Sequence, residues 1–438
     1  MHGALRDLPT SAGRRTARGP GPLGAGRKLL AFSGPAYLVA VGYVDPGNWA
    51  TDIAAGSAFG YGLLSVVLLS SVMAFVLQTL AARLGIATGQ DLAQACRQNL
   101  PRAANAGLWL LAEIGICACD LAELLGAALG LKLLFGVPLL AGVVLTTFDV
   151  LLILALQKSG FRKLEAVVIA LLAIVAGCFL VQLGLAGVDP AQMARGFAPK
   201  ADLITDPRQL YLAAGILGAT IMPHNLYLHG ALVQDRSPAG AAETKRARAR
   251  WATVDSAIAL GLAMMLNAAI LVLAAATFHQ RGLSSVGDIS EAHRLIAPLL
   301  GAGAAGLFAL ALLAAGQNAS ITATLAGQVV MEGFLRWRLS LTARRTITRL
   351  VALVPAVAVI GIYGEQGLGR LLILSQVVLS LQLPFAVVPL VAFTGRRRLM
   401  GDLVSPGWLK ATAWTIAACI IALNLALVLG WLFGSRAS

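Results

Sequence analysis

Two short motifs each place a side chain that can bind a cation next to a proline and an asparagine. They are Asp45-Pro46-Gly47-Asn48 and Met222-Pro223-His224-Asn225. Proline has no N–H group, so each motif frees backbone carbonyls about one turn earlier, near Gly42 and Ala219. These carbonyls lie at the electronegative ends of the preceding half-helices. Together with the carboxylate and an amide oxygen, they make the oxygen ligands of a cation site.

Met222 adds a thioether, which is a soft ligand that suits Mn²⁺, Fe²⁺, Co²⁺ or Cd²⁺ better than Ca²⁺ or Mg²⁺. The alternative interpretation is that both prolines only kink membrane helices. A simple kink would require none of the polar residues Asp45, Asn48, His224 and Asn225. We therefore interpret the two motifs as halves of one binding site.

The elements that carry these motifs are apolar helices. The 438 residues are 58% hydrophobic and 12% charged, about half the charged share of a soluble domain. Continuous runs of about 20 apolar residues are long enough to cross a bilayer, and they do not alternate as barrel strands do. We expect an all-α polytopic membrane protein with eleven spans, at residues 31–57, 61–86, 106–134, 138–157, 164–187, 209–234, 252–278, 303–334, 347–364, 368–395 and 409–434.

The net charge of +14 could indicate a nucleic-acid partner, but its distribution does not. Most Lys and Arg residues, including Arg344, Arg345 and Arg349, fall in segments that share one side of the predicted membrane. This asymmetry follows the positive-inside rule and predicts a cytoplasmic N-terminus and an external C-terminus. Residues 1–28 are expected to be a disordered cytoplasmic tail without a cleavable signal peptide. The five cysteines lack paired spacing and are expected to be packing residues.

Each motif interrupts the first span of a five-span unit. Five is an odd number, so the second unit would be inverted relative to the first. We expect one inverted repeat at 29–187, a second at 207–395 and an eleventh helix at 409–434. In transporters built this way, substrate binds at the midplane between discontinuous helices.

The third span carries Glu113, Asp120 and Glu123, which project within an arc of about 80° on a helix. The free-energy cost of acidic side chains facing lipid would be prohibitive, so this face should line the protein interior or a water path. It could be a static ion-pair network or a proton route leading from the site. Asp45 would be the first proton acceptor, and His224 could take part because histidine can titrate near neutral pH.

Further polar residues are expected near the site in lesser roles. His229 is expected to pack or to form a hydrogen bond. Thr220 and Asn267 are expected to be polar lining.

The two motifs, as "DPGN" (45–48) and "MPHNLYLH" (222–229), resemble the Nramp (MntH-type) family of proton-coupled divalent metal transporters. "GQNASITATLAGQVVMEGF" (316–334) and "LLILSQVVLSLQLPFA" (371–386) resemble stretches of its eighth and tenth helices. The resemblance covers residues 30–434. It implies a LeuT-type fold of two inverted five-helix repeats (helices 1–5 and 6–10) plus an eleventh helix, with helices 1 and 6 discontinuous.

The resemblance also implies a set of ligands and partners. The metal would be contacted by Asp45, Asn48, Met222 and the Ala219 carbonyl, with the Gly42 carbonyl and the Gln376 amide joining in some conformations. Arg344 and Arg345 resemble the family's arginine partners for the acidic face, although they could equally be a positive-inside cluster. Asn225 and Gly230 depart from the residues that are common in bacterial members, Val and Ser, which leaves the ligands intact.

We therefore expect a monomeric secondary transporter in a bacterial inner membrane. It would import Mn²⁺ or Fe²⁺, and also Cd²⁺ or Co²⁺, together with protons, and it would need no cofactor. The alternatives are a Na⁺-coupled amino-acid symporter of the same fold and an ion channel. An enzyme is disfavoured, because the sequence shows no nucleophile–base pair, nucleotide-binding loop or HExxH-like spacing.

Overall fold

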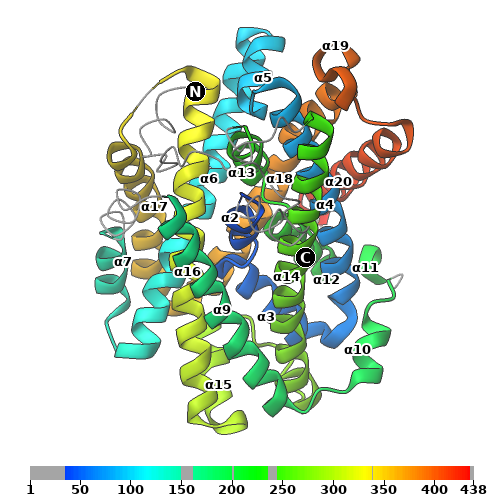
Figure 1. Ribbon diagram of the computed structural model, residues 1–438. Helices are drawn as coiled ribbons and strands as arrows, with labels where there is room; N and C mark the ends of the chain where they lie inside the picture. The colour runs from blue at the N-terminus through cyan, green and yellow to red at the C-terminus, as the bar shows by residue number, and fades with distance from the viewer. Residues whose placement is uncertain (1–34, 149–160, 200–201, 235–243, 338, 435–438) are drawn as a thin grey trace, which may run out of the picture.

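The computed structural model describes residues 35–148, 161–199, 202–234, 244–337 and 339–434, and within them all regular structure is helical (Figure 1). The longer helices are α4 (Leu64–Thr88), α6 (Arg102–Phe135), α9 (Phe161–Ala186), α14 (Lys245–Thr277), α16 (Ala302–Leu335), α17 (Leu341–Tyr363), α18 (Leu368–Thr394) and α20 (Gly407–Gly434). The shorter ones are α2 (Pro35–Gly42), α3 (Pro46–Phe59), α5 (Leu92–Asn99), α7 (Leu139–Thr147), α10 (Pro190–Gly196), α11 (Asp202–Thr205), α12 (Pro207–Thr220), α13 (Pro223–Leu232), α15 (Ile289–Leu300) and α19 (Arg397–Met400). Four 3₁₀ turns join them: η1 (Gly60–Leu63), η2 (His279–Arg281), η3 (Gly364–Gly367) and η4 (Gly401–Leu403).

Helices occur at every predicted span, but not all of them are long. Seven segments of the described chain could cross a membrane by length and composition: Pro46–Thr88, Arg102–Phe135, Ala166–Ala186, Lys245–Arg281, Ala302–Leu335, Leu368–Thr394 and Gly407–Leu432. The remaining predicted spans are shorter because α2 and α12 end at the breaks, α13 begins at the second break, and α17 carries only a short apolar stretch. The predicted tail 1–28 and the second half of span 138–157 lie outside the described residues.

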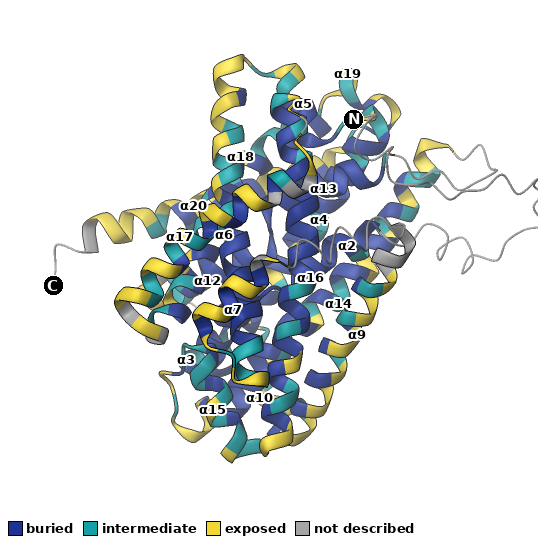
Figure 2. Cartoon of the chain, turned by 90° about the vertical axis from the view of Figure 1, so that its left-hand side faces the viewer, coloured by how far each residue is buried: buried dark blue, intermediate teal, exposed yellow. Residues whose placement is uncertain are grey.

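The surface of the bundle is apolar, and its largely apolar interior also holds buried polar and charged residues. Leu180, Val354 and Trp431 are each at least 70% exposed, whereas Asp45 and Gln376 are fully buried. Exposed residues follow the outer helices α17 and α20, and buried ones fill α4 and α13 (Figure 2). In water this distribution would be unfavourable, so it indicates a lipid surrounding.

Both predicted breaks are present. Helix α2 closes with turns from Tyr43 N to the Ala40 carbonyl (3.0 Å) and from Val44 N to the Val41 carbonyl (3.1 Å). Helix α3 then starts at Pro46, and the Asp45 side chain caps it by accepting a hydrogen bond from Asn48 N at 2.7 Å. Helix α13 likewise starts with a proline. Proline suits the first helical position because its ring fixes φ and the missing N–H would have no partner there.

The breaks are enclosed by the longest helices. Helices α6 and α16 make the most extensive contact in the bundle, and α14 packs along α2, α3 and α4. Figure 1 shows α2 and α3 in the middle, with α5 and α19 at one end and α15 at the other. Backbone groups freed by the breaks are therefore surrounded by protein rather than lipid, which is the condition for irregular backbone at membrane depth.

Close approach at the first break depends on Gly126 of α6. A Cβ atom at this position would lie 2.1 Å from Pro46 Cγ and 2.2 Å from Pro46 Cβ. Neither atom belongs to a flexible side-chain end, so α6 or the start of α3 would have to move. Gly107, on the same helix, is exposed, and a Cβ atom added there would have no neighbouring atom within 4 Å.

We predict that Gly126→Ala lowers stability by about 1–3 kcal/mol, the usual cost of overpacking. Gly107→Ala is the matched control and should be neutral or slightly stabilising, because alanine favours a helix interior. Thermal unfolding of the purified proteins in detergent, monitored by size-exclusion chromatography, measures the unfolding midpoints of both variants. Equal midpoints for the two variants would contradict the close contact.

Candidate metal site

Gln376 of helix α18 lies close to both breaks. A Cβ atom on Gly47, in the first turn of α3, would lie 1.7 Å from Gln376 Nε2. A Cβ atom on Gly218, near the end of α12, would lie 2.0 Å from the Gln376 carbonyl oxygen. The two breaks also touch directly, because Asn225 Nδ2 lies 2.6 Å from the Cβ position of Gly42. The residues predicted as ligands thus gather in one place: Gly42, Asp45, Asn48, Ala219, Met222 and Gln376.

Several side-chain oxygens at this place are buried and have no hydrogen-bond partner among the described residues: Asp45 Oδ2, Asn48 Oδ1, Gln376 Oε1 and, on the second break, Asn225 Oδ1. The other polar atom of each of these side chains already takes part in a hydrogen bond. Asp45 Oδ1 caps α3, Asn48 Nδ2 donates to the Tyr43 carbonyl at 2.8 Å, and Gln376 Nε2 donates to Ser375 Oγ at 3.0 Å. Buried oxygens without donors are costly, and a cation would satisfy them. Met222, fully buried at the second break, adds a sulfur.

Asn267 of α14 forms a hydrogen bond with the backbone of the first break. Its Nδ2 donates to the Tyr43 carbonyl at 2.8 Å, which is the same carbonyl that Asn48 Nδ2 binds. Asn267 therefore fixes the turn that orients Asn48. Thr220 lines a small cavity together with Tyr43 and Asn267. The predicted polar lining residues thus lie beside the break.

The Tyr43 side chain starts a second polar chain that leads away from the site. Gln78 Nε2 donates to the Tyr43 hydroxyl at 2.6 Å, and Gln78 Oε1 lies 2.9 Å from His229 Nδ1. All three residues are buried. His229 forms a hydrogen bond, in agreement with the expectation from its sequence position. Sequence reasoning missed Gln78 and Tyr43, although a glutamine within an apolar span was a signal that could have pointed to Gln78.

The acidic face of α6 is paired with α17. Glu113 forms an ion pair with Arg344 and accepts a hydrogen bond from Trp109 Nε1 at 3.0 Å. The predicted partnership of Arg344 with this face is therefore seen in the structure. The side chain of Arg345, the other predicted partner, lies outside what the structure describes.

The other two acids have a partner that sequence reasoning did not identify. Arg349 Nε lies 3.4 Å from Asp120 Oδ1, and its Nη2 lies 4.0 Å from Glu123 Oε2 and 2.5 Å from Ser320 Oγ. Arg349 is 1% exposed. The charge pattern along the sequence groups it with the basic residues at the cytoplasmic end. Arg349 lies inside an apolar helix, and this position was the signal that its charge needed buried partners.

His224 lies between the second break and the acidic face. Its Nε2 is 3.8 Å from Cys119 Sγ of α6, and its buried Nδ1 has no partner among the described residues. In the described chain no group of three or more His, Cys, Asp or Glu side chains is arranged to hold a metal ion. The set at the breaks is of another kind, with one carboxylate, two amides and a thioether.

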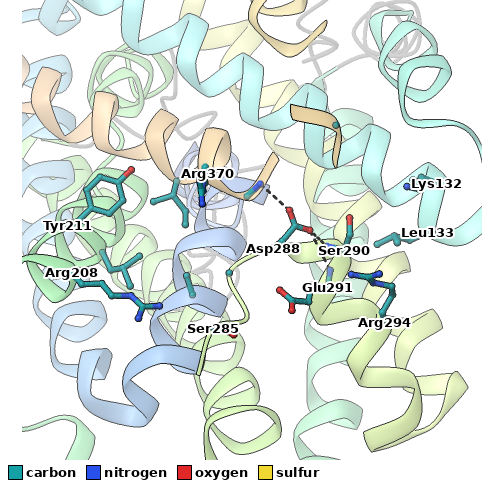
Figure 3. Close-up of a pocket in the computed structure, with 16 residues that line it drawn as sticks. Lys132, Leu133, Arg208, Tyr211, Ser285, Asp288, Ser290, Glu291, Arg294 and Arg370 are labelled. Carbon is teal, nitrogen blue, oxygen red and sulfur yellow. Dashed lines mark hydrogen bonds between the residues drawn. The ribbon is translucent and has the colours of Figure 1, made fainter. Parts of the chain in front are cut away.

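A cavity of about 1360 Å³ opens toward the α15 end of the bundle (Figure 3). Its buried lining includes Ala54 of α3, Leu212 of α12 and Ile373 of α18. Asn48 precedes Ala54 by six residues, about 9 Å along a helix, and Gln376 follows Ile373 by three. Asp45 itself is fully buried. The cavity therefore ends a short distance from the breaks without exposing them.

Comparisons with known proteins agree with this architecture. The family model described as "Natural resistance-associated macrophage protein-like" (Nramp) matches residues 36–430. A protein named "Divalent metal cation transporter MntH" from Xanthomonas campestris pv. campestris is 58% identical over 402 residues, covering 92% of this chain and 90% of the relative. A protein of the same name from Agrobacterium fabrum is 57% identical over 407 residues, covering 93% and 88%.

Solved structures give the same result. A mutant of the Eremococcus coleocola manganese transporter superposes with a TM-score of 0.86 at 39% identity, covering 95% of this chain and 91% of that one. MHP1, a nucleobase-cation-symport-1 family transporter, superposes with a TM-score of 0.58 at 18% identity, covering 91% and 90%. The second likeness concerns the fold alone. The predicted all-α, LeuT-type fold is confirmed.

We predict that Arg349→Ala destabilises the protein by about 3–5 kcal/mol, because it leaves Asp120 and Glu123 buried without their cation. The control is Arg246→Ala, which removes an exposed pair with Asp402 (4.0 Å) and should cost at most about 1 kcal/mol. Thermal unfolding in detergent measures both. If the two variants unfold at the same temperature, Arg349 does not compensate the acids.

Proposed function

The chain belongs to the Nramp family, and from this membership and its site we propose that it is a divalent metal transporter that imports Mn²⁺ or Fe²⁺ together with protons. The observation that carries the proposal is the set of unpartnered, buried oxygens of Asp45, Asn48 and Gln376 beside the thioether of Met222. The relatives' names, which describe divalent metal and manganese transporters, support it.

The chemistry of the set favours transition metals. Carboxylate and amide oxygens bind any divalent cation, whereas a thioether contributes little to Ca²⁺ or Mg²⁺. The carbonyls of Gly42 and Ala219 would complete the coordination from the ends of the two half-helices. We assign the metal contacts to six residues: Gly42, Asp45, Asn48, Ala219, Met222 and Gln376. Cd²⁺ and Co²⁺ would fit the same ligands.

The first break argues against the amino-acid symporter. A transporter of that kind holds its substrate's carboxylate at the N-terminus of a half-helix. Here the Asp45 carboxylate already occupies the N-terminus of α3 and accepts the Asn48 N–H at 2.7 Å. A second carboxylate would be repelled there, and a cation would be attracted.

Proton coupling is assigned to Asp45 and the acidic face. A metal ion bound to Asp45 requires the ionised carboxylate, so binding releases any proton that the residue holds. His224 lies on the side of the second break that faces α6, where Asp120 and Glu123 pair with Arg349 and Glu113 pairs with Arg344. We infer that the proton leaves along this face, on a path separate from the metal.

Alternating access would open the site at either end. The cavity at the α15 end is the proposed external vestibule. At the other end α2 is held by the buried Asp255, whose Oδ2 accepts a hydrogen bond from Ala36 N at 3.1 Å, and by the Tyr43–Gln78–His229 chain. Release of these contacts would let α2 move and open a cytoplasmic path.

The remaining assignments rest on the sequence. We place the protein in a bacterial inner membrane as a monomer, with its N-terminus in the cytoplasm and its C-terminus outside. The two inverted repeats would span 29–187 and 207–395, with residues 409–434 as an additional helix. No cofactor and no nucleic acid are required for this activity.

We predict that wild-type protein in proteoliposomes takes up Mn²⁺ and acidifies the lumen, and that Asp45→Ala reduces uptake at least tenfold because the ligand set loses its carboxylate. Asp402→Ala, which removes an exposed carboxylate, is the control and should transport normally. A manganese-sensitive dye and a pH-sensitive dye inside the vesicles measure both ions. Unchanged uptake by Asp45→Ala would refute the site.

We predict that Met222→Ala weakens discrimination against Ca²⁺ and Mg²⁺, because the soft ligand is lost while the oxygen ligands stay. Met331→Ala is the matched control, since it removes another buried methionine, on α16, that is not among the proposed ligands. Competition of Ca²⁺ with Mn²⁺ uptake is the measurement. Both variants should lose some stability, but only Met222→Ala should admit Ca²⁺. Equal selectivity in both would contradict the role of the thioether.

A further inference from the structure

Asp52 of α3 is a buried acid that takes no part in the contacts at the breaks. Its side chain is 2% exposed, and its Oδ2 has no hydrogen-bond partner among the described residues. It follows Asn48 by four residues, which is about one turn of the helix. Acidic side chains are almost never buried without a partner. Packing alone therefore does not explain Asp52.

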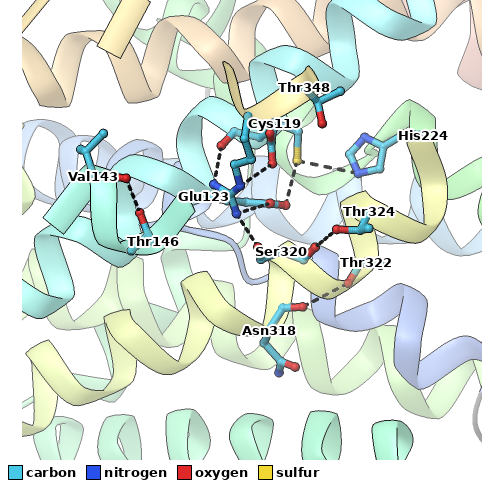
Figure 4. Close-up of polar contacts among 12 residues, drawn as sticks. Cys119, Glu123, Val143, Thr146, His224, Asn318, Ser320, Thr322, Thr324 and Thr348 are labelled. Atoms are coloured by element: carbon cyan, nitrogen blue, oxygen red, sulfur yellow. Dashed lines mark hydrogen bonds and ion pairs between the residues drawn. The ribbon is translucent and has the colours of Figure 1, made fainter. Parts of the chain in front are cut away.

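The other buried acids of the described chain each accept a hydrogen bond or pair with an arginine: Asp45, Asp91, Asp120, Glu123 and Asp255. Figure 4 shows one of them, Glu123, where Cys119 Sγ lies 3.5 Å from its Oε1. Asp52 differs from this group, because within the described residues its side chain has neither a hydrogen bond nor an ion pair.

Asp52 projects between α12 and α14, away from the cavity at the α15 end. Thr51 packs against α12, where its Cγ2 lies 3.0 Å from the Cβ position of Gly215. A Cβ atom on Gly56 would lie 2.4 Å from a backbone oxygen of α14. At 100° per residue Asp52 falls between these two contacts, about 160° around the helix from Ala54 in the cavity wall. Its charge is therefore enclosed by protein, where electrostatic effects are stronger than in water.

The charged group that acts on Asp52 is Asp45, which is a proposed metal ligand. Seven residues separate the two, about 10 Å along a helix. Without a cation the two carboxylates repel each other. A divalent ion bound at Asp45 brings two positive charges into the buried site, and Asp45 offsets one of them. Asp52 supplies the second negative charge.

We propose that Asp52 is a specificity-determining residue, whose charge offsets the second charge of a divalent ion at the breaks and so favours divalent over monovalent cations. This inference rests on the proposed metal site. Asp52 acts through space and is not a ligand. Coulomb energy is proportional to the charge of the ion, so Asp52 attracts a divalent ion twice as strongly as a monovalent one. Met222 would select for softness, and Asp52 for charge.

The size of the effect follows from the separation. At about 10 Å and an effective dielectric constant of about 20, one charge changes the affinity for a divalent ion on the order of 100-fold and for a monovalent ion on the order of tenfold. A role in packing gives no such dependence on the charge of the ion, because a distorted site loses affinity for both ions alike.

The experiment measures Mn²⁺ binding to full-length protein in detergent by calorimetry, and Tl⁺ binding by competition with Mn²⁺. Asp52→Asn keeps the shape of the side chain and removes its charge. It should weaken Mn²⁺ binding at least tenfold, and Tl⁺ binding by about the square root of that factor. Asp52→Glu restores the charge and should stay within threefold of wild type for both ions. Asp402→Asn makes the same chemical change at an exposed position and should match wild type.

Thermal unfolding without metal is the second measurement. Asp52→Asn should unfold at the same temperature as wild type or higher, because an unpaired buried charge is removed. A lower midpoint would show that the carboxylate holds the fold together, and it would overturn the proposal.

Wild-type Mn²⁺ affinity in Asp52→Asn would also overturn it, as would losses of equal factor for Mn²⁺ and Tl⁺. Asp45→Ala, measured in parallel, tests the metal site itself. Wild-type Mn²⁺ affinity in Asp45→Ala refutes the site and this inference with it. A loss in Asp45→Ala beside wild-type affinity in Asp52→Asn refutes this inference alone.

Discussion

A helix that breaks inside an apolar surrounding must find partners for its freed backbone groups within the protein, because lipid offers none. This constraint explains why both breaks lie at the centre of the bundle. Asp45 caps the start of α3, and the Tyr43 carbonyl is satisfied by Asn48 and by Asn267 from α14. Glycines let neighbouring elements come close enough to enclose the breaks, as Gly126 does against Pro46.

The same hydrogen bonds leave several buried side-chain oxygens without a donor. Asn48 and Gln376 use their N–H groups on protein acceptors, so their carbonyl oxygens stay without donors beside the second oxygen of Asp45. A break that only bent the helix would have no need of such groups. The buried oxygens and the sulfur of Met222 are the physical basis for proposing a transition-metal ion as the substrate.

Buried charge away from the breaks is organised differently. Along α6, Glu113 pairs with Arg344, and Asp120 and Glu123 pair with Arg349, so two arginines offset most of the charge of three buried acids. A metal ion would gain little there, because the acids already have cations. Cys119 of this face lies 3.8 Å from His224 Nε2, so the proposed proton route would begin beside the second break. The two substrates would thus share Asp45 and then follow different routes.

The sequence by itself determined the helical class, the positions of the spans, the two breaks and the residue types that stand at them, because proline, charge and apolar length act locally along the chain. The acidic face of α6 also followed from helical spacing alone. Only the tertiary structure showed that Arg349 compensates Asp120 and Glu123, that Gln78 joins Tyr43 to His229, and that Cys119 touches both His224 and Glu123. These contacts join helices that are far apart in the sequence. Helical spacing fixes which face a side chain occupies, but the packing of the bundle decides which residue it meets there.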